Sequence, residues 1–161
     1  MIVPAGRRAQ HNINMGREPY YAHCVFCRIA TGEVSAPVVY SSDYDIAFLD
    51  INPIRRGHIQ IIPVEHFDYF DDLPVPVAAE ILSVGQQLAR ALKAVCSVSR
   101  VAFLFTGGDI PHAHAHVVPI VEFDDITSRR YIVEDQVSYR DAPRAAESDL
   151  ASCAALIRAS L

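Results

Sequence analysis

The sequence has no uninterrupted apolar stretch of the about 18 residues that are needed to cross a bilayer. The segment after Met1 also lacks the apolar core that a secretory signal needs. We therefore expect no membrane span, no membrane partner and a cytoplasmic location. Internal repeats and low-complexity segments are absent as well, which argues against solenoid or disordered architectures.

Positive charge is also scarce, since the 161 residues carry a formal net charge of −5. Proteins that bind nucleic acids over a broad surface are usually basic, so we expect no nucleic-acid partner. A small anionic ligand is still compatible with this net charge, because the charge of the local pocket decides whether such a ligand binds. With 51% hydrophobic and 20% charged residues, the composition is that of a globular domain with its own core.

Cysteine is limited to four residues, Cys24, Cys27, Cys96 and Cys153. A disulfide framework is not expected where no secretion signal precedes the chain. Cys24 and Cys27 form a C-x-x-C pair, which is typical of a metal clip or a redox pair. Cys96 and Cys153 lie in apolar helical patterns, where cysteine behaves as a small buried hydrophobe.

The periodicity of apolar residues predicts an α+β fold with a five-stranded antiparallel sheet, one long helix and a C-terminal helix. Residues 1–22 show no steady period, so we predict a flexible N-terminal arm there and a single domain over 23–161. A short helix is expected at 24–30, ended by Gly32, and the long helix at 76–96 opens with two prolines. The strands are expected at 38–40, 46–49, 58–62, 101–105 and 113–120, and the last helix at 147–161.

The most informative segment is the alternating run from His112 through His114 to His116. In a strand, residues two apart point to the same face, so three imidazoles share one surface and two alanines the other. Such a run could be a surface patch, a metal site or a catalytic centre. A neutral imidazole is a good nucleophile toward phosphorus, and neighbouring histidines can neutralise phosphoryl oxygens.

Four ordered motifs together resemble the histidine triad (HIT) family. They span about residues 24–120. In chain order the motifs are Cys24-Val-Phe-Cys-Arg-Ile29, Ala47-Phe-Leu-Asp-Ile-Asn-Pro53, Gly57-His-Ile-Gln-Ile-Ile-Pro63 with Glu65-His66, and His112-Ala-His-Ala-His-Val-Val-Pro119. This resemblance implies the HIT α+β fold, a homodimer and a small nucleotide substrate. The implied activity is hydrolysis at the α-phosphate of adenosine phosphoramidates or dinucleoside polyphosphates.

The resemblance also implies a catalytic scheme. His114 attacks the α-phosphate and forms a nucleotidyl-histidine, which water then hydrolyses. His116 contacts the phosphate oxygens, the backbone carbonyl of His112 holds His114, and His58 supports the triad from the adjacent strand. For His58, a satisfied core histidine is an equal alternative. Two other functions remain open: nucleotidyl transfer through the same intermediate, and nucleotide binding by a non-enzymatic regulator.

Bacterial relatives in the family resemble this chain in a second group, Cys24, Cys27, His66 and His112. Two thiolates and two imidazoles suit tetrahedral Zn²⁺, so the resemblance implies a structural zinc. The alternative is a pair of reduced, buried thiols. A redox role is disfavoured, because no thioredoxin-like βαβ unit follows the C-x-x-C pair.

The resemblance further implies a nucleoside pocket. Asp50 is expected to accept hydrogen bonds from the ribose, with a plain turn residue as the alternative. The base is expected to lie among apolar side chains, for which a simple core role is the alternative: Phe26, Ile29, Phe48 and Ile51. Backbone amides of Gly107 and Gly108 are expected to cradle the phosphate.

The loop before the triad departs from the family, because it is short and lacks the usual glutamine. Only Thr106, Asp109 and the glycine amides remain to assist the leaving group. An anionic leaving group next to Asp109 is disfavoured, so the sequence predicts that a phosphoramidate is a better substrate than a polyphosphate.

Overall fold

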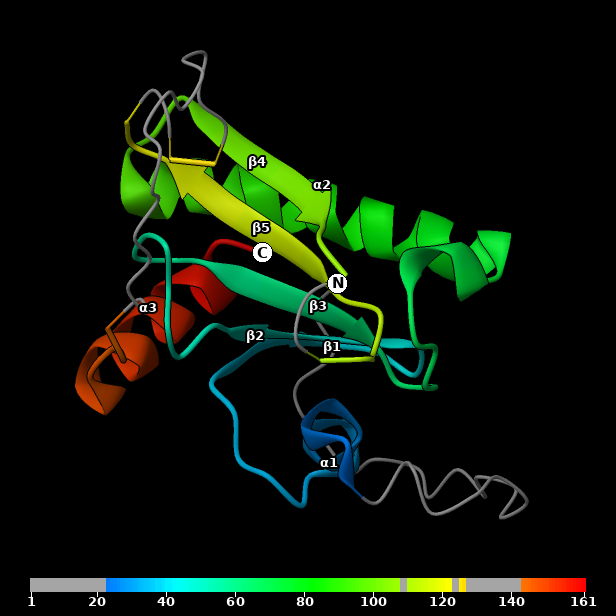
Figure 1. Cartoon of the computed structure of the whole chain (residues 1–161). Helices are drawn as coiled ribbons and strands as arrows, with labels where there is room; N and C mark the ends of the chain where they lie inside the picture. The colour runs from blue at the N-terminus through cyan, green and yellow to red at the C-terminus, as the bar shows by residue number, and fades with distance from the viewer. Residues whose placement is uncertain (1–22, 108–109, 123–124, 127–142) are drawn as a thin grey trace, which may run out of the picture.

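The computed structural model describes residues 23–107, 110–122, 125–126 and 143–161. The expected arm at 1–22 lies outside these residues, so the division into an arm and one domain stays a prediction. Within the described part, Figure 1 shows a sheet with helices against it. The helices are α1 (Val25–Thr31), α2 (Val75–Cys96) and α3 (Glu147–Ala159), with a 3-10 turn, η2, at Phe70–Asp72. The strands are β1 (Val38–Ser41), β2 (Asp45–Leu49), β3 (Ile59–Pro63), β4 (Arg100–Phe105) and β5 (Ala115–Ile120).

The five strands form one antiparallel sheet in the order β1-β2-β3-β5-β4. β3 and β4 are separated along the chain by α2, and β5 returns between them. This arrangement confirms the predicted α+β fold. It also brings the 58–63 segment beside the histidine segment, since Gln60 is paired with His116 and Ile61 with Ala115.

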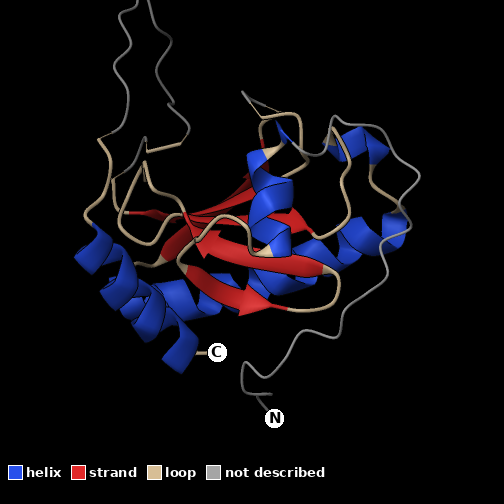
Figure 2. Cartoon of the chain, turned by 90° about the horizontal axis from the view of Figure 1, so that it is seen from below, coloured by secondary structure: helices blue, strands red, loops and turns tan. Residues whose placement is uncertain are grey.

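The sheet separates two apolar clusters. On one face, α2 and α3 pack over the larger cluster, whose sheet residues include Ala47, Ile61 and Ala115. On the other face, α1 packs over a smaller cluster that contains Ile46 and Ile62. Figure 2 shows α1 as a short helix crossing the sheet, with the longer helices behind it. Because neighbouring strand residues alternate between the two clusters, the sheet is covered by helices on both faces.

Local sequence explains where several elements end. α1 ends at Gly32, whose φ of 82° is readily adopted only without a side chain. The β1–β2 turn is closed by the Ser42 hydroxyl, which accepts from the backbone N–H groups of Tyr44 and Asp45. At Gly85 of α2, an added Cβ would lie 2.4 Å from the Phe103 ring, so glycine permits the close approach of α2 to β4.

The amphipathic pattern of α2 is confirmed, with Ile81, Leu88 and Leu92 fully buried. Leu82, which also fits the apolar period, is 50% exposed, so the pattern overestimates the width of the buried face. No helix in the described ranges is both long enough and apolar enough to cross a membrane.

The predicted start of the last strand is wrong by two residues. Sheet pairing of β5 begins at Ala115 rather than Ala113. Pro63 at the end of β3 has no N–H to continue the ladder. The Ala113 N–H instead donates to the carbonyl of Phe67, at 2.6 Å, in the connection between β3 and α2. The histidine segment is therefore held by this connection at one end and by the sheet at the other.

Candidate active site and metal centre

The predicted alternation of the histidine segment is confirmed. Ala113 and Ala115 belong to the larger apolar cluster. His112 and His114 lie on the α1 side, where both contact the Phe26 ring edge-on, with ring centroids 5.8 and 5.2 Å away. The His114 and His116 rings are neighbours, with centroids 4.9 Å apart. One short segment thus delivers three imidazoles to the same face. His112 and His116 belong to two separate groups, and His114 lies between them.

The first group is the metal cluster, made of Cys24, Cys27, His66 and His112. One donor atom from each residue lies within 4.8 Å of all the others. His112 Nδ1 lies 3.4 Å from Cys24 Sγ and 3.5 Å from Cys27 Sγ, and His66 Nδ1 lies 3.1 Å from Cys27 Sγ. Sulfur and nitrogen ligands on a tetrahedral Zn²⁺ are about 3.5 Å apart. The structure therefore brings together all four residues that the sequence indicated.

The outer contacts of the two histidines orient their donor atoms. His66 Nε2 lies 2.8 Å from Asp68 Oδ1, and His112 Nε2 lies 3.1 Å from the Pro63 carbonyl oxygen. Both acceptors require a proton on Nε2, which leaves the Nδ1 lone pairs directed at the cluster. This is the arrangement that a metal-bound imidazole needs, and the donor set fits a zinc ion.

Burial sets the protonation of the metal cluster. Burial and the neighbouring Cys24 thiol raise the pKa of Cys27 to about 12. Burial lowers the pKa of His112 to about 4, so this imidazole is neutral and has a lone pair available at neutral pH. A cation would reverse the thiol shift, since metal binding releases protons from its ligands.

The second group is the relay, made of Asp50, His58, His116 and Thr106. Its members follow one another in a line. Asp50 Oδ2 is 3.5 Å from His58 Nδ1, His58 Nε2 is 2.9 Å from His116 Nδ1, and His116 Nε2 is 3.2 Å from Thr106 Oγ1. Burial lowers the pKa values of His58 and His116, that of His116 to about 4. Both imidazoles are therefore neutral at pH 7.

The hydrogen-bond partners of His58 assign the tautomers of the relay. The backbone N–H of Ile54 donates to His58 Nδ1, at 3.3 Å. The proton of His58 is then on Nε2 and is donated to His116 Nδ1. His116 in turn carries its proton on Nε2, the atom nearest Thr106. The relay therefore presents an N–H donor at its open end.

Asp50, His58 and His116 also have atoms close enough to hold a metal ion. Their geometry favours hydrogen bonding instead. His58 Nδ1 already accepts from the Ile54 N–H, and His58 Nε2 faces His116 Nδ1 at 2.9 Å, so hydrogen bonds occupy the nitrogens that an ion would need. Gln60 Nε2 also donates to Asp50 Oδ2, at 2.6 Å, which occupies the carboxylate oxygen that faces His58.

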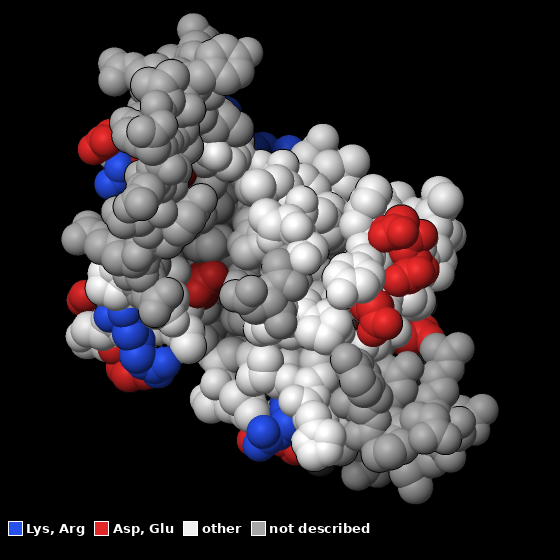
Figure 3. All heavy atoms as spheres, viewed as in Figure 1, with Lys and Arg blue, Asp and Glu red and all other residues white. Residues whose placement is uncertain are grey.

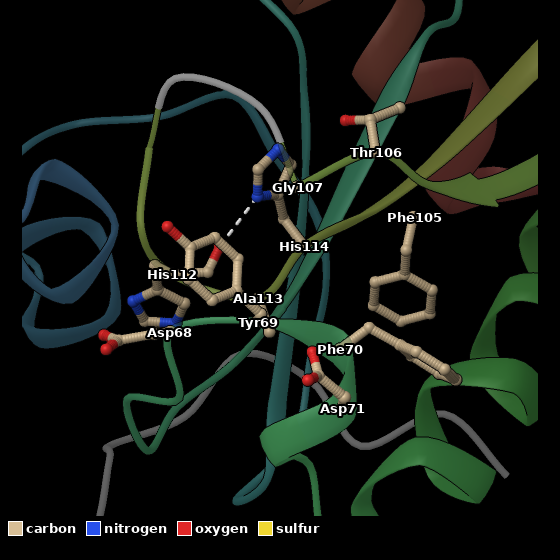
Figure 4. Close-up of a pocket in the computed structure, with 10 residues that line it drawn as sticks. All are labelled: Asp68, Tyr69, Phe70, Asp71, Phe105, Thr106, Gly107, His112, Ala113 and His114. Carbon is tan, nitrogen blue, oxygen red and sulfur yellow. Dashed lines mark hydrogen bonds between the residues drawn. The ribbon is translucent and has the colours of Figure 1, made fainter.

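His114 stands between the metal cluster and the relay. Its Nδ1 donates to the backbone carbonyl of His112, at 2.7 Å, which is the contact that the family resemblance implied. This bond leaves the lone pair on Nε2. The side chain is 7% exposed and lines a pocket of about 270 Å³, shown in Figure 4. No described residue forms a hydrogen bond to that Nε2 atom.

The residues expected around the nucleoside are only partly brought together. Phe26, Ile29 and Phe48 lie in the smaller apolar cluster and are at least nine-tenths buried. Ile51 lies outside that cluster and is 40% exposed. Asp50 accepts from the Asn52 N–H, at 2.7 Å, as a turn residue does. Gly107 lines the pocket, with φ of 60°, whereas Gly108 lies outside the described residues, as does Asp109.

Some residues of the site were not found from the sequence. Asp68 orients His66, and its position two residues after a metal-ligand histidine was the available signal. Gln60 binds Asp50 and pairs with His116, which only the strand register reveals. The side chains of Tyr69 and Asp71 line the pocket next to His114, and no motif marked them.

Comparisons with known proteins identify the family. The HIT domain model matches residues 31–122. An uncharacterised HIT-like protein of Methanocaldococcus jannaschii is 34% identical over 109 residues, which are 63% of this chain and 81% of that protein. An adenosine 5′-monophosphoramidase of Saccharomyces cerevisiae is 30% identical over 99 residues, 61% of this chain and 63% of that protein.

A solved structure gives the same result for the fold. The Zn-bound histidine triad family protein of Mycobacterium smegmatis superposes with a TM-score of 0.67 at 29% identity, covering 87% of this chain and 94% of that one. The domain match spans more than half of the chain and includes all three triad histidines and His58. This chain belongs to the HIT family.

Proposed function

We propose that this protein is a nucleotide hydrolase that cleaves adenosine phosphoramidates, or the related dinucleoside polyphosphates, through a nucleotidyl-histidine intermediate. Hydrolysis of nucleotides in general is supported by family membership and by the similarity to a yeast adenosine 5′-monophosphoramidase. The observation that carries the mechanism is the state of His114. Its Nδ1 is held by the His112 carbonyl, and its Nε2 is directed to a pocket without a protein partner in the described structure.

The reaction balances in two steps. His114 Nε2 donates its lone pair to the α-phosphorus, a P–N bond to the histidine forms, and the bond to the leaving group breaks. The departing atom, nitrogen in a phosphoramidate or phosphate oxygen in a polyphosphate, keeps that electron pair, and the nitrogen takes a proton from solvent. A water oxygen then attacks the same phosphorus and releases a proton to solvent, the histidine P–N bond breaks with its electron pair returning to Nε2, and the nucleoside monophosphate leaves. Covalent catalysis of this kind divides one difficult displacement into two easier ones.

In this proposal the relay stabilises the phosphoryl group. The His116 Nε2–H, which lies 3.2 Å from Thr106 Oγ1, turns to a phosphoryl oxygen when substrate is bound. His58 is a positioning residue, because it fixes the proton of His116 on the outer nitrogen. A fixed N–H donor in a buried site stabilises developing negative charge more than water does, since it needs no reorientation during the reaction.

We further propose that Asp50 binds the ribose. Its carboxylate accepts from Asn52 N–H and Gln60 Nε2, and a carboxylate has about four lone-pair sites, so two remain for ribose hydroxyls. We also propose that Ile51 contacts the base, since it is an exposed apolar side chain beside Asp50. In this proposal Phe26, Ile29 and Phe48 form the apolar floor beneath the base. The backbone amides of Gly107 and Gly108 bind the phosphate.

The metal cluster is proposed to hold a structural zinc ion. When bound, the ion would supply cross-linking of α1, the β3–α2 connection and the histidine segment, through Cys24, Cys27, His66 and His112. Support comes from the converging donor atoms and from the Zn-bound Mycobacterium smegmatis relative. The expected homodimer and cytoplasmic location also stay predictions.

Trapping the intermediate tests the proposed function. The protein is mixed with adenosine phosphoramidate, quenched at alkaline pH within the first turnover, and digested for mass spectrometry. We expect an adenylyl group on the peptide that contains His114. Parallel reactions with diadenosine polyphosphates, and with a nucleotide sugar plus a sugar phosphate, distinguish hydrolysis from transfer. Substrate binding without product or adduct would instead indicate a non-enzymatic regulator.

A further inference from the structure

The pocket beside His114 has a wall that the proposed mechanism does not use. One side is formed by the triad segment and by residues 105–107 before it. The other side is formed by residues 68–71 of the β3–α2 connection. Figure 4 shows His114 and Tyr69 lining the same cavity from these two sides. The ring of Tyr69 lies beside Gly107, where an added Cβ would be in ordinary van der Waals contact with it at 3.7 Å.

The open nitrogen of His114 makes this cavity part of the reaction site. His114 is more than nine-tenths buried, and its Nε2 has no hydrogen-bond partner among the residues that the structure describes. A group displaced from a phosphorus bound to Nε2 departs on the side away from the histidine. Residues that line the pocket with His114 are therefore placed to contact whatever the phosphorus carries.

The wall is acidic. Between Arg56 and Arg90 the sequence contains no lysine or arginine, and its acidic residues there are Glu65, Asp68, Asp71, Asp72 and Glu80. Figure 3 shows acidic side chains gathered over the β3–α2 connection, with no basic side chain of a described residue among them. The sign of the charge on this wall is therefore uniform.

The acidic groups of the wall are not equally available. Asp68 is bound to His66, and the carboxylate of Asp72 accepts from the Tyr69 N–H. Asp71 lines the pocket, is exposed, and has no hydrogen bond or ion pair to any described residue. Its carboxylate is consequently the one that can respond to a charged ligand.

Aromatic rings stand beside this carboxylate. Tyr69 is 46% and Phe70 is 55% exposed, and both line the pocket. Phe70 packs on Phe105 with ring centroids 4.8 Å apart. Exposed aromatic faces next to a carboxylate attract organic cations, because the ring quadrupole and the charge act in the same direction. They repel an anionic group by the same reasoning.

We infer that the 68–71 wall is a leaving-group subsite that selects cationic over anionic leaving groups. The substrate class is a nucleoside phosphoramidate whose amine carries a second, positively charged ammonium group. This inference rests on the proposed function, since it places the leaving group on the side of the phosphorus opposite to the attacking His114. Asp71 is its specificity-determining residue, and Tyr69 provides the aromatic face.

Three adenosine phosphoramidates of similar length test the inference, made from 1,4-diaminobutane, pentylamine and 4-aminobutyrate. Their tails are cationic, neutral and anionic. We expect kcat/KM to fall in that order, by about threefold to tenfold per step, as a partly screened charge at short range allows. Asp71→Asn should contract the cationic-to-anionic ratio by about threefold or more. Asp43→Asn, at the exposed β1–β2 turn, changes the net charge equally and should keep the wild-type ratio.

Two outcomes separate this inference from the proposed function. Turnover that depends on His114 but gives equal kcat/KM for the three tails, or an Asp71→Asn ratio equal to that of the wild type, overturns the subsite alone. Absence of turnover on unsubstituted adenosine phosphoramidate overturns the proposed function. In that case, uncleavable adenosine 5′-carbamates with the same tails decide the subsite by calorimetry, and equal Kd values for all three would contradict it.

Discussion

The metal cluster and the relay share one five-residue segment, yet their nitrogens are arranged in different ways. In the metal cluster, the Nδ1 atoms of His66 and His112 converge on two sulfur atoms, and each Nε2 is tied outward to an oxygen. In the relay, His58 Nδ1 accepts from the Ile54 N–H, and the other ring nitrogens form a line from His58 Nε2 through His116 to Thr106. Convergent lone pairs suit a cation, whereas a line of donors and acceptors suits an anion at its open end. The outer partner of each imidazole therefore decides its chemistry more than the residue type does.

Removing His114, which belongs to neither group, should have the largest effect on activity. His114→Ala is expected to reduce turnover of adenosine phosphoramidate by about three orders of magnitude or more, because the covalent nucleophile is lost. The metal cluster and the sheet should be unaffected, so zinc content and Tm are the controls. A folded variant that turns over like the wild type would exclude the nucleotidyl-histidine mechanism.

Breaking the metal cluster should affect stability first. We expect about one zinc per chain by elemental analysis of protein purified without added metal. The double variant Cys24→Ser, Cys27→Ser should contain none, and its Tm should fall by about 10 °C, because metal-binding free energy contributes to folding free energy. Cys96→Ala, which removes a thiol outside the cluster, should keep the metal.

The effect of the same double variant on catalysis sharpens the comparison. Below its Tm, the kcat of Cys24→Ser, Cys27→Ser should stay within about tenfold of the wild type, since the relay does not include the cluster ligands. A metal-free protein with an unchanged Tm, or a loss of activity as large as that of His114→Ala, would show that the two groups are not separable in this way.

Breaking the relay should have an intermediate effect on catalysis. His58→Ala removes the group that holds the proton of His116 on its outer nitrogen, so kcat is expected to fall by about 10-fold to 100-fold with zinc retained. His58→Gln can still donate to His116 Nδ1 and should recover part of the loss. Nitrogen-15 NMR of the imidazoles reports the tautomer directly: an unchanged Nε2–H state of His116 in His58→Ala would contradict the positioning role.

The smallest expected effect concerns the stability contribution of Asp45. Unlike the two histidine groups, this carboxylate has two buried oxygens that form no hydrogen bond with the part of the chain that the structure describes. Burial, and to a lesser extent Glu80, raise the pKa of Asp45 from 3.8 to about 7. The folded state therefore keeps a proton that the unfolded chain loses above pH 4, so this group's contribution to stability falls as the pH rises toward 7.

Asp45→Asn removes that pH dependence. The free energy of unfolding of the variant minus that of the wild type should be about 1 kcal/mol higher at pH 8 than at pH 5.5, after allowance for solvent screening of the charge. Denaturant unfolding at the two pH values measures the difference. Wild type and variant with parallel pH profiles would mean that Asp45 is ionised in the folded protein at a compensated site.

The sequence alone determined the fold class and the residues of the metal cluster. Periodicity located the three α-helices and five strands of the described residues, though not the 3-10 turn at Phe70–Asp72, because apolar alternation and helical spacing reflect the faces that must be buried. The four motifs indicated Cys24, Cys27, His66 and His112 as one group and His114 as the central histidine. These residues contact one another as expected, since motifs of this kind record chemistry that depends on residue type and spacing.

Only the tertiary structure decided which contacts each of those residues makes. The start of β5 at Ala115 depends on the Phe67 carbonyl, and the order of the relay depends on the register of β3 with β5. The roles of Asp68, Gln60 and Asp71 depend on which strand or loop lies beside the histidines. A linear sequence specifies donors and acceptors, but hydrogen bonds and metal-ligand distances are fixed only when segments 39 to 88 residues apart are brought within a few ångströms.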